Sequence, residues 1–334
     1  MKLLVTGATG FLGQKTVQRL HALGYDVTAL GRNEAIGQQL ESQGIRFTKA
    51  DLRQCKDIMD ACRDMDMVLH CGALSSPWGR YDDFYHTNVE GTRHVIDGCR
   101  THGVKRLIHV STPSIYFAFQ DCLSITEDDP LPRRFANAYA HTKHAAEQDV
   151  FLAAETGLET VILRPRALFG PGDTTIIPRL IRANEKGFVP LINGGMALLD
   201  VTYIDNVVDS LLLAMHAPPQ ALGKAYNITN GQPIQLKRLL DLLFARMGVP
   251  FRGRKIAYPV AALLAAGMEA MATLAPRSKE PLLTRYTVGV LAKSQTLDIS
   301  AARRELGYEP AISIEEGIDR FVQWWQKGAD GHSL

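Results

Sequence analysis

The sequence has few cysteines, and they are not arranged in pairs. There are five in 334 residues, an odd number, and none lies at the spacing of a paired metal-ligand motif. They are Cys55, Cys62, Cys71, Cys99 and Cys122. This pattern argues against a disulfide framework and a zinc site, and it is typical of a protein with reduced thiols. We therefore predict no bound metal and a cytoplasmic location.

A strong net charge and internal repeats are also missing from the sequence. The 37 Lys and Arg residues nearly balance the 35 Asp and Glu residues, which gives a net charge of +2 without any block of like charge. This balance argues against a dedicated nucleic-acid-binding protein. The first apolar run begins close to Met1, so we expect no charged leader with a cleavage site.

What the sequence does contain is an alternation of short apolar runs with helical patterns. Six runs are predicted to be strands, and helical periodicity occupies the segments between them, notably 81–99 and 137–156. The runs span residues 3–5, 25–30, 46–50, 65–70, 105–110 and 160–163. This rhythm predicts an α/β fold with a doubly wound parallel sheet of the Rossmann type.

The rhythm of strands and helices changes after Pro165, where a turn cluster, Gly170 to Asp173, is followed by shorter elements. We therefore expect a dinucleotide-binding Rossmann domain over residues 1–165. Residues 166–334 are predicted to form a smaller substrate region that is partly interleaved with the first.

The first strand ends in a glycine-rich turn that suits a dinucleotide phosphate. Gly7, Gly10 and Gly13 lie three residues apart, and the helical pattern starts at Phe11. Gly7 allows the tight turn, Gly10 lets a pyrophosphate approach the backbone, and Gly13 lets the helix pack on the strand. Three glycines are a weak motif on their own, and an ordinary glycine-rich turn is the alternative.

Tyr139 and Lys143 lie four residues apart in a strongly helical stretch, so their side chains face the same way. A tyrosine ionises near pH ~10, and a neighbouring lysine cation is expected to lower the pKa of that phenol. Such a tyrosine can exchange a proton with a carbonyl or an alcohol near neutral pH. A surface Tyr–Lys pair is the alternative interpretation.

Thr112 follows directly on the fifth predicted strand. A hydroxyl at this place can bond a substrate oxygen and hold it against Tyr139. Ser111 competes for the same role, and strand ends are rich in Ser and Thr simply because the chain turns there. The residues alone do not separate the two.

These elements, in this order, resemble the extended short-chain dehydrogenase/reductase family over nearly the whole chain. Its glycine motif matches Thr6 to Gly13, its Tyr-x-x-x-Lys motif matches Tyr139 and Lys143, and its hydroxyl residue matches Thr112, four residues before Tyr116. Further matches are Asp51-Leu52, Cys71-Gly72-Ala73 and Asn88 to Thr92. The resemblance implies catalysis by Thr112, Tyr139 and Lys143. It also implies cofactor contacts from Gly7, Thr9, Gly10, Phe11, Leu12, Asp51, Leu52, Cys71, Gly72, Ala73, Tyr139, Lys143 and Pro165.

The end of the second predicted strand bears on the choice of cofactor. An NAD site usually has an acidic residue there, whereas this chain has Gly31-Arg32-Asn33. The guanidinium of Arg32 suits a 2′-phosphate, so we predict NADP(H) in preference to NAD(H). The alternative is that Arg32 is a solvated loop residue and both dinucleotides are accepted.

Within the family, the sequence is more similar to the 3β-hydroxysteroid dehydrogenase-like branch, and there to bacterial 2-alkyl-3-oxoalkanoate reductases. The stretches that carry this resemblance are 111–114, 170–173 with 177–180, 202–206, 223–226 and 302–308. Ala167 stands where nucleotide-sugar enzymes have an asparagine, and Pro113-Ser114 stands where dehydratases have an Asp-Glu pair. The branch implies an apolar ketone or alcohol as substrate. We place Trp78, Ser114 and Arg166 among the substrate contacts.

One apolar stretch, residues 256–275, approaches the length of a membrane span but contains Glu269. Three interpretations stay open: a span, a helix that covers the active site or lies on a membrane surface, and plain core.

The sequence therefore predicts an NAD(P)-dependent oxidoreductase that interconverts a ketone and a secondary alcohol on a β-keto or β-hydroxy long-chain acid or a sterol-like molecule. A nucleotide-sugar epimerase or reductase is the first alternative. A non-catalytic dinucleotide-binding regulatory scaffold is the second. We expect a small hydrophobic partner, no nucleic acid, and a homodimer.

Overall fold

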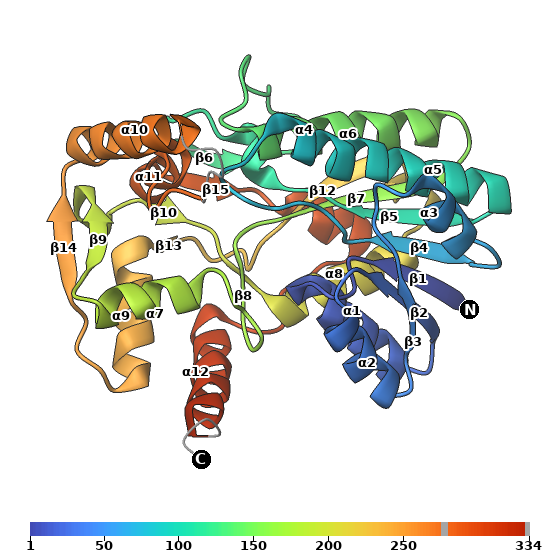
Figure 1. Cartoon of the computed structure of the whole chain (residues 1–334), viewed down its shortest axis with the longest axis horizontal. Coiled ribbons are helices and arrows are strands. Elements are labelled where there is room, and N and C mark those ends of the chain that lie inside the picture. Colours follow the sequence, from blue (N-terminus) through green and yellow to red (C-terminus); the bar gives the residue numbers. More distant parts are fainter. Residues whose placement is uncertain (275–279, 331–334) are drawn as a thin grey trace.

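The computed structural model describes residues 1–274 and 280–330, and its centre is a seven-stranded sheet with all neighbouring strands parallel (Figure 1). The strand order is β12-β7-β5-β4-β1-β2-β3. The bounds are β1 Lys2–Thr6, β2 Asp26–Gly31, β3 Arg46–Lys49, β4 Met67–His70, β5 Arg106–Val110, β7 Glu159–Pro165 and β12 Lys224–Ile228. The predicted α/β class with a doubly wound parallel sheet is confirmed.

Helices cover both faces of this sheet, and the strand residues show why. In β1, Leu3 and Val5 pack in one core cluster with Val17 of α1 (Phe11–Ala22) and Leu211 of α8 (Ile204–Met215). Leu4, between them, packs in a second cluster on the opposite face. Helices α3 (Cys55–Ala61), α5 (Gly91–His102) and α6 (Ala138–Glu155) lie on that second face. Burial of both faces explains why the strands read as continuous apolar runs.

The order of the strands reverses between β1 and β4, since β2 and β3 continue in one direction and β5 and β7 in the other. In open α/β sheets, such a switch point opens a crevice beyond the carboxyl ends of the strands. The loops after β1 and β4 meet there.

Two strands join parts of the chain that are far apart in sequence. β12 lies beyond residue 165 and was not among the six predicted strands, yet it pairs with β7 in the main sheet. β6 (Cys122–Ile125) lies before residue 165 and pairs with β15 (Gln295–Leu297). The division into 1–165 and 166–334 stays a prediction. In both of these strand pairs, one strand comes from each side of the predicted boundary.

In the described residues, the later part of the chain carries small sheets and, besides α8, five further α-helices. The strands are β8 Leu168–Phe169, β9 Val189–Ile192, β10 Leu198–Leu199, β11 Thr202–Tyr203, β13 Ile234–Gln235 and β14 Gly253–Ile256. The helices are α7 Ile177–Glu185, α9 Leu236–Met247, α10 Tyr258–Leu274, α11 Arg285–Ala292 and α12 Ile314–Asp330. Most of them gather at the end of the molecule away from α1 and α2 (Glu34–Ser42) (Figure 1).

The helix predicted over residues 81–99 is interrupted. Its segments are α4 (Tyr81–Phe84), a π-helical turn at Tyr85–Glu90, and α5. The wide turn contains Asn88, whose side chain accepts a hydrogen bond from Leu74 N at 2.7 Å and donates to Leu74 O at 3.1 Å. Single π turns of this kind occur often at functional sites. Here the turn ties the loop after β4 to the helical layer.

The apolar stretch 256–275 forms α10 as far as Leu274, and residue 275 lies outside the described residues. Ala261, Ala265 and Glu269 face inward, while Leu263 and Met271 are about three-quarters exposed at 76% and 74%. None of the helices in the described chain has the length and apolar character that a membrane crossing needs. Peripheral membrane contact stays a prediction, and it falls on the exposed side of α10.

Candidate active site

The glycine turn between β1 and α1 is built by close backbone packing. Gly7 has φ +67°, and a Cβ there would lie 2.6 Å from the Cα of Gly72, in the loop after β4. A Cβ at Gly13 would overlap the carbonyl oxygen of Gly7 and lie 2.7 Å from the Cα of Ala8. Both positions therefore exclude any side chain. Helix α1 is held directly against the turn.

The N-terminus of α1 is left open by this packing. Gly10 is the N-cap and provides no side-chain bond, so the first-turn amides, which include those of Phe11 and Leu12, have no capping partner among the described residues. The side of Gly10 is exposed, and a Cβ there would meet only Gly7 O, at 3.3 Å. Thr9 packs against Gly31 beside it. This cradle fits the pyrophosphate of a dinucleotide, because free amides and the helix dipole favour an anion.

The predicted cofactor residues lie at the carboxyl ends of the parallel strands and therefore along one edge of the sheet. At the end of β2, the Arg32 side chain is 62% exposed, and its Nη1 lies 3.8 Å from Asp51 Oδ2. Arg53 bonds the same carboxylate at 2.7 Å and holds the pKa of Asp51 below its usual range. Leu52 follows β3, Cys71, Gly72 and Ala73 follow β4, and Pro165 ends β7.

Tyr139 lies in the first turn of α6, whose N-cap is Asn137. The phenol is hydrogen-bonded by the hydroxyls of Ser75 and Thr112, which act to lower its pKa. Burial opposes them and is the larger effect, so the pKa of Tyr139 lies above its ordinary value. Lys143 is not among the groups that lower it. The expected lowering of the tyrosine pKa by this lysine is therefore wrong for the structure described here.

The Lys143 ammonium is directed to the end of β5. It donates to Val110 O at 2.8 Å and lies 3.1 Å from Nε2 of His109, both at the end of β5. Burial lowers the pKa of Lys143 to about 8 and holds that of His109 well below its ordinary value, so the histidine is neutral and accepts. An ammonium has three donors, so one remains for a ligand.

Thr112 and Ser114 form a short chain of hydroxyls that ends at Tyr139. Thr112 Oγ1 donates to Ser114 Oγ at 3.0 Å, and Ser114 Oγ accepts from Tyr286 Oη at 2.9 Å. The competing Ser111 is buried, and its hydroxyl has no hydrogen-bond partner among the described residues. Thr112 is therefore the hydroxyl that the structure places at the tyrosine.

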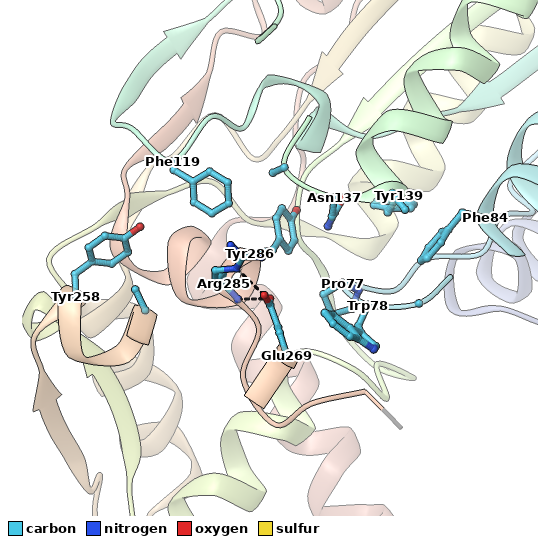
Figure 2. A pocket seen from close by; sticks show the side chains of 14 residues that line it. Pro77, Trp78, Phe84, Phe119, Asn137, Tyr139, Tyr258, Glu269, Arg285 and Tyr286 are labelled. Carbon is cyan, nitrogen blue, oxygen red and sulfur yellow. Dashed lines mark hydrogen bonds and ion pairs between the residues drawn. The ribbon is translucent and has the colours of Figure 1, made fainter. Parts of the chain in front are cut away.

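Tyr139 opens into a cavity of ≈ 480 Å³ (Figure 2). Its lining includes Trp78, one of the predicted substrate contacts, but not Arg166, which is buried and hydrogen-bonded to Gln295. Ser114 does not line the cavity itself, but its hydroxyl is hydrogen-bonded to Tyr286, which does. The full lining is Pro77, Trp78, Gly79, Phe84, Phe119, Ala136, Asn137, Ala138, Tyr139, Tyr258, Ala262, Glu269, Arg285 and Tyr286.

The NAD dependent epimerase/dehydratase family model matches residues 3–229, which contain the glycine turn, Thr112, Tyr139 and Lys143. The chain belongs to this family. Its extended short-chain dehydrogenase/reductase character, predicted from the sequence, is thereby confirmed.

Curated relatives in this family cover nearly the full chain. The chain is 39% identical to the uncharacterized protein YbjS of Escherichia coli, over 97% of each chain. It is 38% identical to a 2-alkyl-3-oxoalkanoate reductase of Stenotrophomonas maltophilia, over 96% of this chain and 98% of the relative. It is 31% identical to a sterol-4-alpha-carboxylate 3-dehydrogenase of Mus musculus, over 96% and 90%. These relatives bear out the predicted resemblance to the 3β-hydroxysteroid dehydrogenase-like branch.

Among solved structures, the fold is similar to that of a UDP-glucuronic acid 4-epimerase from Bacillus cereus in complex with NAD. The TM-score is 0.79 at 21% identity, and the match covers 98% of this chain and 99% of the other. At this identity the likeness establishes the epimerase/dehydratase fold alone.

The walls of the cavity were largely missed by sequence reasoning. Tyr258, Glu269, Arg285 and Tyr286 come from α10 and α11, more than a hundred residues after Tyr139. No local motif marks them. Asn137 did carry a signal, because an asparagine directly before a helical stretch is a typical N-cap.

Proposed function

We propose that the protein is an NAD(P)-dependent oxidoreductase that interconverts a ketone and a secondary alcohol on a hydrophobic substrate. The observation that carries this proposal is the position of Tyr139, whose hydroxyl is bonded to Thr112 at the edge of a cavity walled mainly by aromatic and aliphatic side chains. Apolar cavities with a few placed polar groups are typical of small-molecule sites.

The roles of the residues follow from their contacts. Tyr139 gives its proton to the developing alkoxide during reduction and takes it back during oxidation. The Thr112 hydroxyl lies at the phenol and, by turning its proton from Ser114 to the substrate oxygen, would orient that oxygen and donate where negative charge develops. Lys143 uses its remaining donor to hold the ribose of the dinucleotide. When it is bound, the dinucleotide supplies or accepts the hydride.

The first alternative, a nucleotide-sugar epimerase or reductase, is less well supported. The cavity offers an aromatic lining, with Trp78, Phe84, Phe119 and Tyr258, in place of the many hydrogen-bonding groups that a sugar nucleotide requires. The curated relatives named above act, by their names, on an oxoalkanoate and a sterol carboxylate. The second alternative, a regulatory scaffold, is disfavoured because Tyr139 and Lys143 are both present and buried near the strand ends. The cytoplasmic location and the homodimer stay predictions.

The proposed activity predicts turnover of apolar ketones and not of sugar nucleotides. Oxidation of NADPH would be followed by absorbance with a panel of long-chain and cyclic ketones, alongside UDP- and dTDP-4-keto sugars. We expect apolar ketones to be favoured in kcat/KM by at least about 100-fold, which corresponds to about 2.7 kcal/mol. Turnover of a UDP-sugar without turnover of any apolar ketone would reject the proposal in favour of the first alternative.

We further propose that NADP(H) is preferred and that Arg32 reads the 2′-phosphate. Its guanidinium is exposed at the end of β2, where the strand ends without a carboxylate. Replacing Arg32 with glutamate is expected to lower kcat/KM for NADPH by about 10- to 100-fold, because a charge-assisted contact becomes a repulsion. The value for NADH should stay within about 3-fold.

Arg63 provides the matched control for this substitution. Its side chain is also 62% exposed, and it pairs with Asp60 of α3 at 3.0 Å. Arg63→Glu should leave both cofactor preferences unchanged. If Arg32→Glu leaves the ratio of kcat/KM for NADPH to that for NADH unaltered, another residue binds the 2′-phosphate.

A further inference from the structure

The cavity beside Tyr139 contains an ion pair that the proposed mechanism does not use. Glu269 of α10 accepts from the backbone N–H of Arg285 at 2.7 Å and from its Nε at 2.6 Å (Figure 2). Glu269 is buried, whereas the side chain of Arg285 is 66% exposed. Among the described residues that line the cavity, Arg285 is the one cation.

This pair leaves donors available to a ligand. The bonds that the described residues offer Arg285 occupy its backbone N–H and Nε, so both terminal nitrogens of the guanidinium stay open. Asn137, at the N-terminus of α6, adds a second donor. Its Oδ1 caps α6 by accepting from Ala140 N at 2.8 Å, but its Nδ2 is buried without any partner in the described chain. Figure 2 shows Asn137 close to Tyr139 and Arg285 next to Tyr286.

The contacts also tie Arg285 to the reacting group. It is followed in α11 by Tyr286, whose hydroxyl donates to Ser114. Ser114 accepts in turn from Thr112, which bonds Tyr139. A substrate oxygen held by Thr112 and Tyr139 therefore lies on the same wall as the start of α11. An anionic group close to the reacting carbon of that substrate would meet Asn137 and Arg285.

We propose that Arg285, with Asn137, is the carboxylate-binding element of the cavity, so that the substrate is a 3-oxo or 3-hydroxy acid with an apolar chain. This inference rests on the proposed function and specifies its substrate class. Only one carbon separates the carboxylate from the reacting carbon in such an acid. A carboxylate brought into an apolar cavity without a paired cation would be strongly destabilised, and a fixed guanidinium offers two parallel N–H donors to it.

Glu269 acts here as a positioning residue. By holding Nε and the backbone of Arg285, it fixes the plane of the guanidinium and directs the remaining donors away from itself. It also prevents a bare cation from facing the aromatic side chains when no substrate is present. Because the pair is neutral as a whole, neutral ketones are not excluded from the cavity, but they gain nothing from it.

The test compares 3-hydroxydodecanoate with its methyl ester, which has the same chain without the charge. For the wild-type protein, oxidation is followed as NADPH formation, and binding is measured by calorimetry. We expect Arg285→Gln to lower kcat/KM for the acid by about 30- to 100-fold and its affinity by a similar factor. The ester should change by less than about 3-fold in both measurements.

Two further variants separate recognition from structure. Arg285→Gln leaves Glu269 buried without its partner, so the double variant with Glu269→Gln is made to remove the stranded charge, and it should show the same loss for the acid alone. Arg179→Gln is the matched control, because it removes a cation from an exposed pair with Glu280, at 2.9 Å, outside the cavity lining. This variant should behave as wild type with both ligands.

The outcomes are distinct. An equal loss for acid and ester, or no loss for the acid, would overturn the assignment of Arg285. Absence of turnover with both compounds, combined with Arg285-dependent binding of the acid, would retain the carboxylate site and reject the proposed oxidoreductase function. Turnover of both compounds at equal rates by the wild type would retain the function and reject the carboxylate site.

Discussion

Replacement of Tyr139 by phenylalanine is expected to lower kcat for the ketone–alcohol reaction by about 10³-fold, within the range that general acid–base groups contribute. The substitution removes one oxygen and keeps the ring, which lies 6.5 Å from that of Phe84, centroid to centroid. Dinucleotide affinity should change little, because the pyrophosphate cradle lies between β1 and α1 and the Lys143 ammonium is held by Val110 and His109 of β5. The measurement is steady-state kinetics together with the shift in Tm that NADPH produces.

Tyr85→Phe is the control for this variant. Its hydroxyl accepts from Arg93 at 3.2 Å on the helical layer and lies outside the cavity lining. It should retain full activity. Full activity in Tyr139→Phe, with the cofactor-induced shift in Tm intact, would show that another group transfers the proton.

The second large effect concerns stability. In Gly13→Ala, the new methyl group would meet the carbonyl oxygen of Gly7 and the Cα of Ala8, both of which are backbone atoms that cannot rotate away. We expect the free energy of unfolding to fall by about 3 kcal/mol, the upper part of the range for overpacked sites. Thermal unfolding without cofactor would show a Tm lower by several degrees.

Alanine substitutions at two other glycines serve as controls for Gly13→Ala. Gly267 is also helical, but a Cβ there would have no atom within 4 Å, so Gly267→Ala should leave stability unchanged or raise it by up to about 1 kcal/mol. Gly10→Ala should keep the Tm of the free protein and weaken dinucleotide binding, because its open side faces the cradle. A wild-type Tm in Gly13→Ala would contradict the packing argument.

The parts of the molecule that sequence reasoning reached are those in which few neighbouring residues determine the structure. The turn from Gly7 to Gly13 is specified by its own glycines, and the spacing of Tyr139 and Lys143 puts them on one helix face. Five of the six predicted strands are largely buried, so they read as apolar runs, whereas β3 at the edge of the sheet is partly exposed.

Other features depend on contacts that no local pattern encodes. The direction of the Lys143 ammonium is set by His109 and Val110 of β5, and the pKa of Tyr139 is raised by burial, which the spacing of the two residues does not reveal. The π turn at Asn88 is tied by two hydrogen bonds to the backbone of Leu74, in the loop after β4. Likewise, the predicted contact at Arg166 was displaced from the cavity because its guanidinium bonds Gln295 in a distant segment.

The hydrogen bond between Ser114 and Tyr286 joins residues 172 positions apart in the chain. On the ribosome, the glycine turn and Tyr139 emerge long before α11 does, and the main sheet itself lacks its last strand until β12 has been made. Chain segments fold in the order in which they can complete their contacts. The glycine turn can therefore form while α11 is still being synthesised, and the growing chain contains Tyr139 before it contains Arg285.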